Sequence, residues 1–224
     1  SERLGECLFC VMHALIERLV REGTVVTDGA WGTMLQAQGL PAGACPDEWN
    51  LSHPGEVLTV ARRYVEAGSR IILTNTFGAN PIALEKHGLA GRAAEINRAG
   101  ARLSRQAAEG RALVFASIGP TGKLLLMGEV SAEAVRRAYE VQAQALAEGG
   151  AEGLVIETMA DLAEARVALQ AAQSTGLPVA ACMSFDSGPA GMHTMMGVSA
   201  DQAARALTES GADVIGANCG NGIE

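Results

Sequence analysis

The sequence predicts an α/β fold in which helices cover a parallel sheet. The chain of 224 residues is 48% hydrophobic but only 4% aromatic, with 27 glycines. This composition favours small-residue helices packed closely on a parallel sheet over an aromatic-rich β-sandwich. An amphipathic helix, a glycine stop and a short apolar run also alternate along the chain. This alternation is typical of an open doubly wound sheet or of a closed (β/α) barrel.

The elements follow one another in a single domain without a linker. The segment from Glu6 to Arg21 has apolar residues at helical spacing, so residues 1–23 are expected to form an N-terminal helical extension before a barrel domain over residues 24–224. Clear helices are expected from Pro54 to Ala67, from Ser131 to Glu148 and from Asp161 to Thr175. Six strands are expected, over residues 24–27, 70–74, 112–117, 153–156, 178–184 and 213–217.

Charge and cysteine content exclude several classes of protein. The formal net charge is −8 and the acidic residues are scattered, so neither nucleic acid nor an anionic membrane is an expected partner. No apolar run approaches the roughly 20 residues that span a bilayer. Five cysteines without regular spacing predict reduced thiols and a cytoplasmic location. Cys7 and Cys10 are expected on the apolar face of the first helix, because a single pair is a weak signal for a zinc or redox site.

Unusual polar residues gather at the carboxyl ends of the expected strands. A parallel barrel builds its active site at this end, so the sequence predicts a common functional face. The absence of Gly-x-Gly-x-x-Gly after the first strand weakens a dinucleotide-binding alternative. The residues concerned are Asp28, Asn75, Thr76, Glu157, Asp186, Asn218 and Cys219.

Two carboxylates are the first candidates on this face. Asp28 ends an apolar strand and could accept hydrogen bonds from an ammonium group, although an Asp-Gly turn or a helix cap explains it as well. Glu157 follows a buried strand, where an unpaired carboxylate costs several kcal/mol or has a raised pKa. A bound cationic group, or a salt bridge to an arginine of the same rim, would relieve that cost.

The cysteines and one loop have competing interpretations. Cys219 lies among glycines that allow a close backbone approach, so it could be a metal ligand or a nucleophile, or an ordinary unreactive thiol. Cys182, within an expected strand, reads as a core cysteine, and Cys45 has no evident partner. The loop Gly119 to Gly122 could cradle an anion or form a tight turn.

Taken together, the motifs resemble a known family. The chain is similar to the homocysteine-binding domain of homocysteine S-methyltransferases, with most likeness to the cobalamin-dependent methionine synthase branch. The resemblance begins near Val25 and runs in the expected order to the last residue. The motifs that carry it are Asp28-Gly29-Ala30-Trp31-Gly32-Thr33-Met34-Leu35-Gln36, Trp49-Asn50-Leu51, Thr74-Asn75-Thr76-Phe77-Gly78-Ala79-Asn80, Ser117-Ile118-Gly119-Pro120-Thr121-Gly122, Ile156-Glu157-Thr158-Met159, Met196-Gly197-Val198-Ser199 and Gly216-Ala217-Asn218-Cys219-Gly220-Asn221-Gly222.

The resemblance implies a TIM-type barrel, of which about six of eight βα units are present, and a methyl transfer to homocysteine. Cys219 would be the first of three cysteine ligands to a catalytic zinc. Asp28 and Glu157 would hold the substrate's amino group, with backbone at Gly29 and Ala30 and near Thr76 close to its amino-acid portion. Methylcobalamin on a partner domain or protein is the expected donor, with methyltetrahydrofolate upstream.

One departure from the family limits this expectation. The family's other two zinc-ligand cysteines and two further βα units would follow Glu224, and no other cysteine here occupies a matching position. We therefore expect a fragment of a longer protein, or a split enzyme completed by a second chain, with the N-terminal helix covering part of the opening. The alternatives for function are a betaine- or S-methylmethionine-dependent methyltransferase and a non-catalytic barrel fragment that binds an amino acid or a partner chain.

Overall fold

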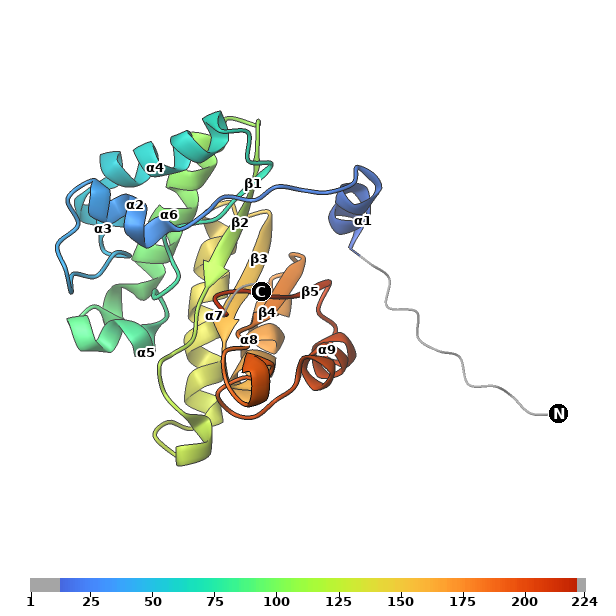
Figure 1. The fold of residues 1–224 in the computed structure, drawn as a ribbon. Helices are drawn as coiled ribbons and strands as arrows, with labels where there is room; N and C mark the ends of the chain where they lie inside the picture. The colour runs from blue at the N-terminus through green and yellow to red at the C-terminus, as the bar shows by residue number, and fades with distance from the viewer. Residues whose placement is uncertain (1–12, 221–224) are drawn as a thin grey trace.

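The computed structural model describes residues 13–220, which form an α/β fold around an all-parallel sheet (Figure 1). The sheet has five strands in the order β1-β2-β3-β4-β5, so consecutive strands are neighbours. They are β1 Ile71–Ile72, β2 Leu113–Ile118, β3 Gly153–Met159, β4 Val179–Met183 and β5 Val214–Ala217. The last five expected strands are thereby confirmed. Within the described part of the chain β5 pairs only with β4, and closure into a barrel stays a prediction.

The prediction of a strand over residues 24–27 is wrong. This segment makes one parallel bridge, between Thr27 and Ile71, followed by a hydrogen bond from the Asp28 amide to the Ile71 carbonyl (3.0 Å). The Leu73 amide, which would extend the ladder, instead donates to the side-chain Oδ2 of Asp28 at 2.7 Å. Because the side chain takes this amide, pairing ends at Asp28 and its carboxylate is fixed beside the sheet.

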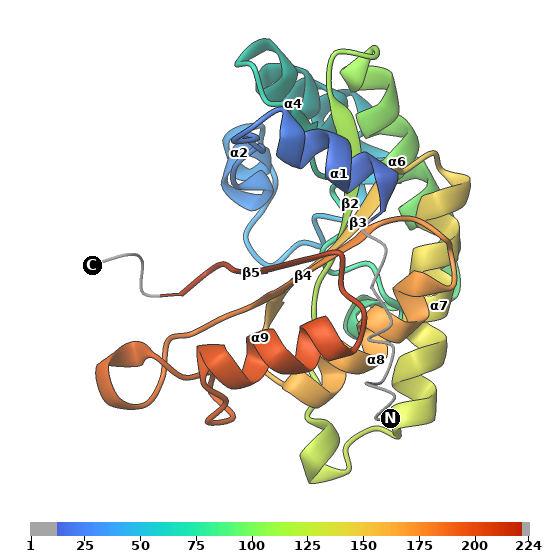
Figure 2. The ribbon, with the colours of Figure 1, turned by 90° about the vertical axis from the view of Figure 1, so that its right-hand side faces the viewer.

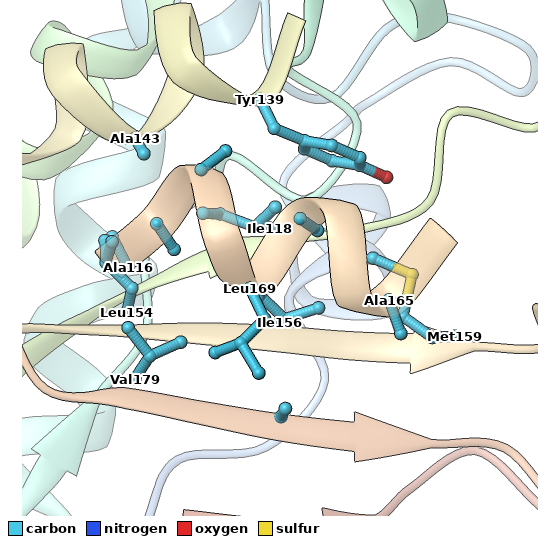
Figure 3. Close-up of a cluster of buried hydrophobic side chains, with 14 of the residues drawn as sticks. Ala116, Ile118, Tyr139, Ala143, Leu154, Ile156, Met159, Ala165, Leu169 and Val179 are labelled. Atoms are coloured by element: carbon cyan, nitrogen blue, oxygen red, sulfur yellow. The ribbon is translucent and has the colours of Figure 1, made fainter. Parts of the chain in front are cut away.

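Helices cover one face of the sheet, and the three helices expected most clearly are confirmed. The side chains of Ser131 and Asp161 accept hydrogen bonds from the backbone amides of Ala134 and Ala163, respectively, and so cap two of these helices. Figure 3 shows the core between α7, α8 and the central strands, where Tyr139 is fully buried. The longer helices are α4 Pro54–Glu66, α6 Ala93–Ala108, α7 Ala132–Glu148, α8 Leu162–Gln173 and α9 Ala200–Glu209.

Shorter helices connect these elements. They are α1 Ala14–Arg21, α2 Trp31–Ala37, α3 Trp49–Ser52 and α5 Pro81–Leu84, with 3₁₀ turns Glu85–His87, Ala90–Arg92, Leu125–Met127 and Pro189–Gly191. Cys7, Cys10 and the first part of the expected N-terminal helix lie outside the described residues. No helix between residues 13 and 220 is long and apolar enough to cross a membrane.

Helix α1 packs on one face of the sheet, and the longer helices pack on the other face. Its buried side chains Ile16 and Leu19 share a cluster with Ile71 of β1 and Phe115 of β2. Figure 2 shows α1 lying across β2 and β3. Successive strand residues point to opposite faces, which is why Ile72 joins a separate cluster with α4. The first helix therefore covers apolar strand residues that would otherwise contact water.

This packing predicts that Leu19→Ala lowers the free energy of unfolding by about 2 to 4 kcal/mol, the usual cost of removing a buried leucine side chain. Leu19 is 6% exposed, whereas its neighbour Val20 is 63% exposed. Val20→Ala is therefore a matched control, and we expect it to change stability by less than about 0.5 kcal/mol. Urea denaturation followed by circular dichroism measures both. Equal effects of the two substitutions would contradict the docking of α1.

Candidate functional site

A cavity of about 890 Å³ opens at the carboxyl ends of the strands. Five of the residues predicted from the sequence at this face line it, namely Gly29, Ala30, Asn75, Glu157 and Cys219. Loops that follow β1 and β2 form much of the remaining wall. The lining comprises Gly29, Ala30, Trp31, Gly32, Cys45, Pro46, Asp47, Leu73, Thr74, Asn75, Phe77, Gly78, Ile82, Ala83, Glu85, Lys86, His87, Ser117, Pro120, Thr121, Gly122, Lys123, Glu157, Thr158 and Cys219.

Asp28 lies directly before the cavity wall and is only partly satisfied. Its Oδ2 accepts hydrogen bonds from Trp31 Nε1 at 2.8 Å and from Leu73 N at 2.7 Å. Its Oδ1 is buried without a hydrogen-bond partner among the described residues. The pKa of Asp28 is raised to about 6, mainly by burial. The two hydrogen bonds lower this pKa, and the charge of Glu157 contributes to raising it. Ala30, not Asp28, caps helix α2, so the helix-cap explanation fails.

Glu157 lies inside β3, slightly before the strand end, and not after it as expected. Its Oε1 accepts the Ser117 hydroxyl and its Oε2 accepts Asn218 Nδ2 at 3.2 Å. Burial raises the pKa of Glu157, and the Ser117 hydrogen bond opposes this. No arginine in residues 13–220 makes a salt bridge with it. Two neighbouring carboxylates therefore lack a protein cation, a state that a ligand cation would stabilise.

Cys219 is exposed and lines the cavity, so it is not a buried inert thiol. Its Sγ lies 3.5 Å from Thr158 Oγ1 and 3.6 Å from Asn218 Nδ2. Cys182 differs, because burial and then the charge of Glu157 raise its pKa to about 11. Cys182 therefore stays protonated at neutral pH, as expected of an ordinary core cysteine.

Thr76 lies behind the wall of the cavity and does not line it. The side chain is fully buried, and Oγ1 donates to the Ser117 carbonyl at 2.8 Å. The backbone amide donates to Thr74 O at 2.9 Å, and the carbonyl accepts Gln142 Nε2 at 2.8 Å. The neighbouring residues Asn75 and Phe77 are the ones that face the cavity.

The sequence did not signal the pair Cys45 and Asp47, which also line the cavity. Asp47 Oδ1 accepts the Gly78 amide at 2.9 Å, and Cys45 Sγ lies 3.8 Å from Asp47 Oδ2. Burial raises the pKa of Asp47 to about 6. A β-carbon at Gly78 would lie 2.9 Å from Asp47 Oδ2, so the glycine permits this close approach. The hydrogen bond between Asp47 and Gly78 joins residues 31 positions apart, which local sequence patterns do not reveal.

The loop from Gly119 to Gly122 is held by the protein. Glu164 Oε1 accepts both the amide and the hydroxyl of Thr121 at 2.7 Å, and the Tyr139 hydroxyl at 2.7 Å. Because a buried carboxylate already occupies this amide, the tight-turn interpretation of the loop is favoured over an anion cradle.

The described residues do not fit a zinc site by themselves. A catalytic zinc takes three protein ligands, commonly from cysteine, histidine and carboxylate side chains. Between residues 13 and 220 no three such side chains converge at a possible metal position. Among these residues Cys219 therefore lacks the two further ligands that a zinc ion would need.

Comparison with known proteins places this site in context. A family model described as homocysteine S-methyltransferase matches residues 25–224. The chain is 29% identical to the methionine synthase of Mycobacterium tuberculosis over 91% of its own length. It is 33% identical to betaine–homocysteine S-methyltransferase 1 of Danio rerio over 92% of its length. The chain spans 18% of the first relative and 51% of the second.

A solved structure shows the same fold. The metallated homocysteine methyltransferase MmuM from Escherichia coli superposes with a TM-score of 0.77 at 22% identity. The match covers 91% of this chain and 77% of that protein.

The raised pKa of Asp28 predicts a pH-dependent stability. Because the folded pKa of about 6 exceeds the ordinary aspartate pKa of 3.8, the native chain binds the proton more tightly than the unfolded chain. Proton binding by Asp28 therefore contributes on the order of 2 kcal/mol to the free energy of unfolding, after allowing for solvent access. This contribution is complete below about pH 4 and is lost as the pH rises through about 6.

Asp28→Asn removes this titration but keeps an oxygen that can accept from Trp31 and Leu73. We expect the stability of the variant relative to the wild type to increase between about pH 4 and about pH 7. Urea denaturation across this range measures it. Asp201→Asn, at an exposed position on α9, is the control. Parallel pH profiles of wild type and Asp28→Asn would contradict the assignment.

Proposed function

Because the chain belongs to the homocysteine S-methyltransferase family, we propose that its cavity binds L-homocysteine and that a methyl group is transferred to the substrate sulfur, giving methionine. The observation that supports this best is the pair Asp28 and Glu157, two half-buried carboxylates with raised pKa values and no ion-pair partner within residues 13–220. An α-ammonium group is the cation that an amino-acid substrate supplies.

In this proposal the two carboxylates bind the ammonium group of the substrate. The free Oδ1 of Asp28 is the acceptor that lacks a donor, and Glu157 is oriented by Ser117. Gly29 and Ala30 line the adjacent wall, where absent or small side chains let the amino-acid portion approach the backbone. Bringing a cation to these groups favours their ionised forms and offsets the cost of their burial.

The transfer itself needs the substrate sulfur as a thiolate. The sulfur lone pair forms the new bond to the methyl carbon, the bond from donor to methyl breaks, and the donor leaves with that electron pair. Cys219 lines the same cavity as Glu157, so it is placed to face the substrate sulfur. Zinc as the cofactor, with Cys219 as one of its ligands, is a proposal that requires further ligands besides those in residues 13–220.

We propose methylcobalamin on another domain or protein as the donor, with methyltetrahydrofolate as its source. The methionine synthase relatives support this, whereas the betaine–homocysteine S-methyltransferase relatives, at similar identity, support direct transfer from betaine. S-methylmethionine is a further alternative donor. Measuring methionine formation with each donor in turn distinguishes them. Turnover with betaine and none with methylcobalamin would contradict our choice.

A non-catalytic amino-acid-binding module is the second candidate, because Cys219 has no neighbouring metal ligand among the described residues. Zinc content and methionine formation, measured on the intact protein, separate the two.

We further propose a cytoplasmic location, supported by the unpaired thiols of Cys45, Cys182 and Cys219. The partly exposed strand β5, including Val214 and Ile215, supports an added neighbouring strand from the same or a second chain.

Glu157→Gln should weaken L-homocysteine binding about 10- to 100-fold, since it removes a charged partner of the ammonium group. Binding of 4-sulfanylbutanoate, which lacks the amino group, should change far less. Isothermal titration calorimetry measures both ligands. Glu85→Gln is the control, because Glu85 lines the same cavity at an exposed position.

The affinity for homocysteine should also rise with pH through about 6, because the ammonium group binds the ionised form of Asp28. Asp28→Asn should flatten this rise. If Glu157→Gln weakened both ligands equally, the carboxylates would not be the ammonium site.

A further inference from the structure

The carboxamide of Asn218 connects three residues of the cavity wall. Its Nδ2 donates to Glu157 Oε2 at 3.2 Å and to Thr158 Oγ1 at 2.9 Å, and it lies 3.6 Å from Cys219 Sγ. Its Oδ1 accepts the Thr158 amide at 2.8 Å. Glu157 and Thr158 come from β3, whereas Asn218 follows β5, about 60 residues later. One side chain therefore joins the carboxylate to the thiol.

The backbone around this side chain is strained. Thr158 has a φ of 61° and Cys219 a φ of 52°, in the left-handed region that residues other than glycine rarely adopt. The pairing of β3 with β4 also shifts register between Ile156 and Met159, around Thr158. Such conformations are unfavourable and persist where neighbouring groups hold them. The Asn218 carboxamide, which accepts a hydrogen bond from the Thr158 amide, is one such group.

Asn218 is itself fixed by its backbone and not by its side chain alone. Its amide donates to Met183 O at 3.2 Å, and its carbonyl accepts the Ser184 hydroxyl at 2.9 Å. The side chain therefore starts from a defined position at the end of β5. Its donor and acceptor then determine where Glu157 and Thr158 lie.

From this geometry we propose that Asn218 is a positioning residue, which holds the Glu157 carboxylate toward the ammonium group of the substrate and in fixed relation to the Cys219 sulfur. The inference rests on the proposed function. An amide is required because one atom must accept the Thr158 N–H while the other donates to a carboxylate. Aspartate could not donate, and alanine could do neither.

The test uses the intact protein carrying Asn218→Ala, Glu157→Gln or both substitutions. Calorimetry gives the affinity for L-homocysteine and for 4-sulfanylbutanoate, and their ratio is the preference for the amino group. We expect Asn218→Ala to reduce this preference about tenfold, in line with the loss of a hydrogen bond to a charged group. In the Glu157→Gln background it should cause no further reduction, because the two residues act through one interaction.

Ser184→Ala is the matched control, since the Ser184 hydroxyl donates to the backbone carbonyl of Asn218 and not to its carboxamide, and the Asn218 amide still donates to Met183 O. It should leave the preference unchanged. Should Asn218→Ala not fold, Asn218→Ser is read in the same way, because its shorter side chain cannot reach both partners.

Two results would overturn the proposal. The first is an Asn218→Ala variant that prefers L-homocysteine as strongly as the wild type does. The second is an Asn218→Ala variant that loses affinity for both ligands equally, with a loss that adds to that of Glu157→Gln. This second result would indicate a structural role alone. Failure of the proposed function looks different, because the wild-type protein would then not bind L-homocysteine.

Discussion

Parallel pairing of consecutive strands is the constraint on which the site depends. Because β2 through β5 run in one direction and pair in chain order, their carboxyl ends meet on one face. Ser117, Glu157 and Asn218 come from different strands, yet a hydrogen bond joins each to the next. A shift of one residue in this register would turn these side chains to the opposite face of the sheet. The apolar strand residues between helices α6 to α8 and α1 hold that register, so the core determines the geometry of the cavity.

Two kinds of buried carboxylate can be distinguished by their partners. One oxygen of Glu164 accepts three hydrogen bonds from Thr121 and Tyr139, so this carboxylate holds a loop in place. Asp28 has one oxygen with two donors and one buried oxygen with none. Burial is costly for both, but only Asp28 leaves part of that cost uncompensated within the described chain. An uncompensated carboxylate beside an open cavity is the arrangement expected of a cation-binding group.

Much of the fold could be predicted from the sequence because its signals are local. Ser131 and Asp161 mark helix starts, and the apolar runs of β2 and β4 mark strands without knowledge of their neighbours. The wrongly predicted strand over residues 24–27 depends on a non-local contact, the Asp28 side chain on the Leu73 amide. The sequence predicted one common face for Asp28, Glu157 and Cys219 for a similar local reason, since each follows or ends an apolar run, and the structure has them at or beside the cavity. Which of them are satisfied could not be predicted, because that depends on partners tens of residues away.

The strain at Thr158 and Cys219 links the fold to the chemistry. A strand in regular pairing would direct alternate side chains to opposite faces, so Glu157 and Thr158 could not both contact groups on the cavity side. The register shift and the left-handed φ of Thr158 change this, and both Thr158 and Glu157 then contact Asn218. The cost is met by hydrogen bonds from one side chain that is anchored on a different strand. The irregularity of β3 is thus what allows two consecutive residues of one strand, Glu157 and Thr158, to contact Asn218 and line the cavity.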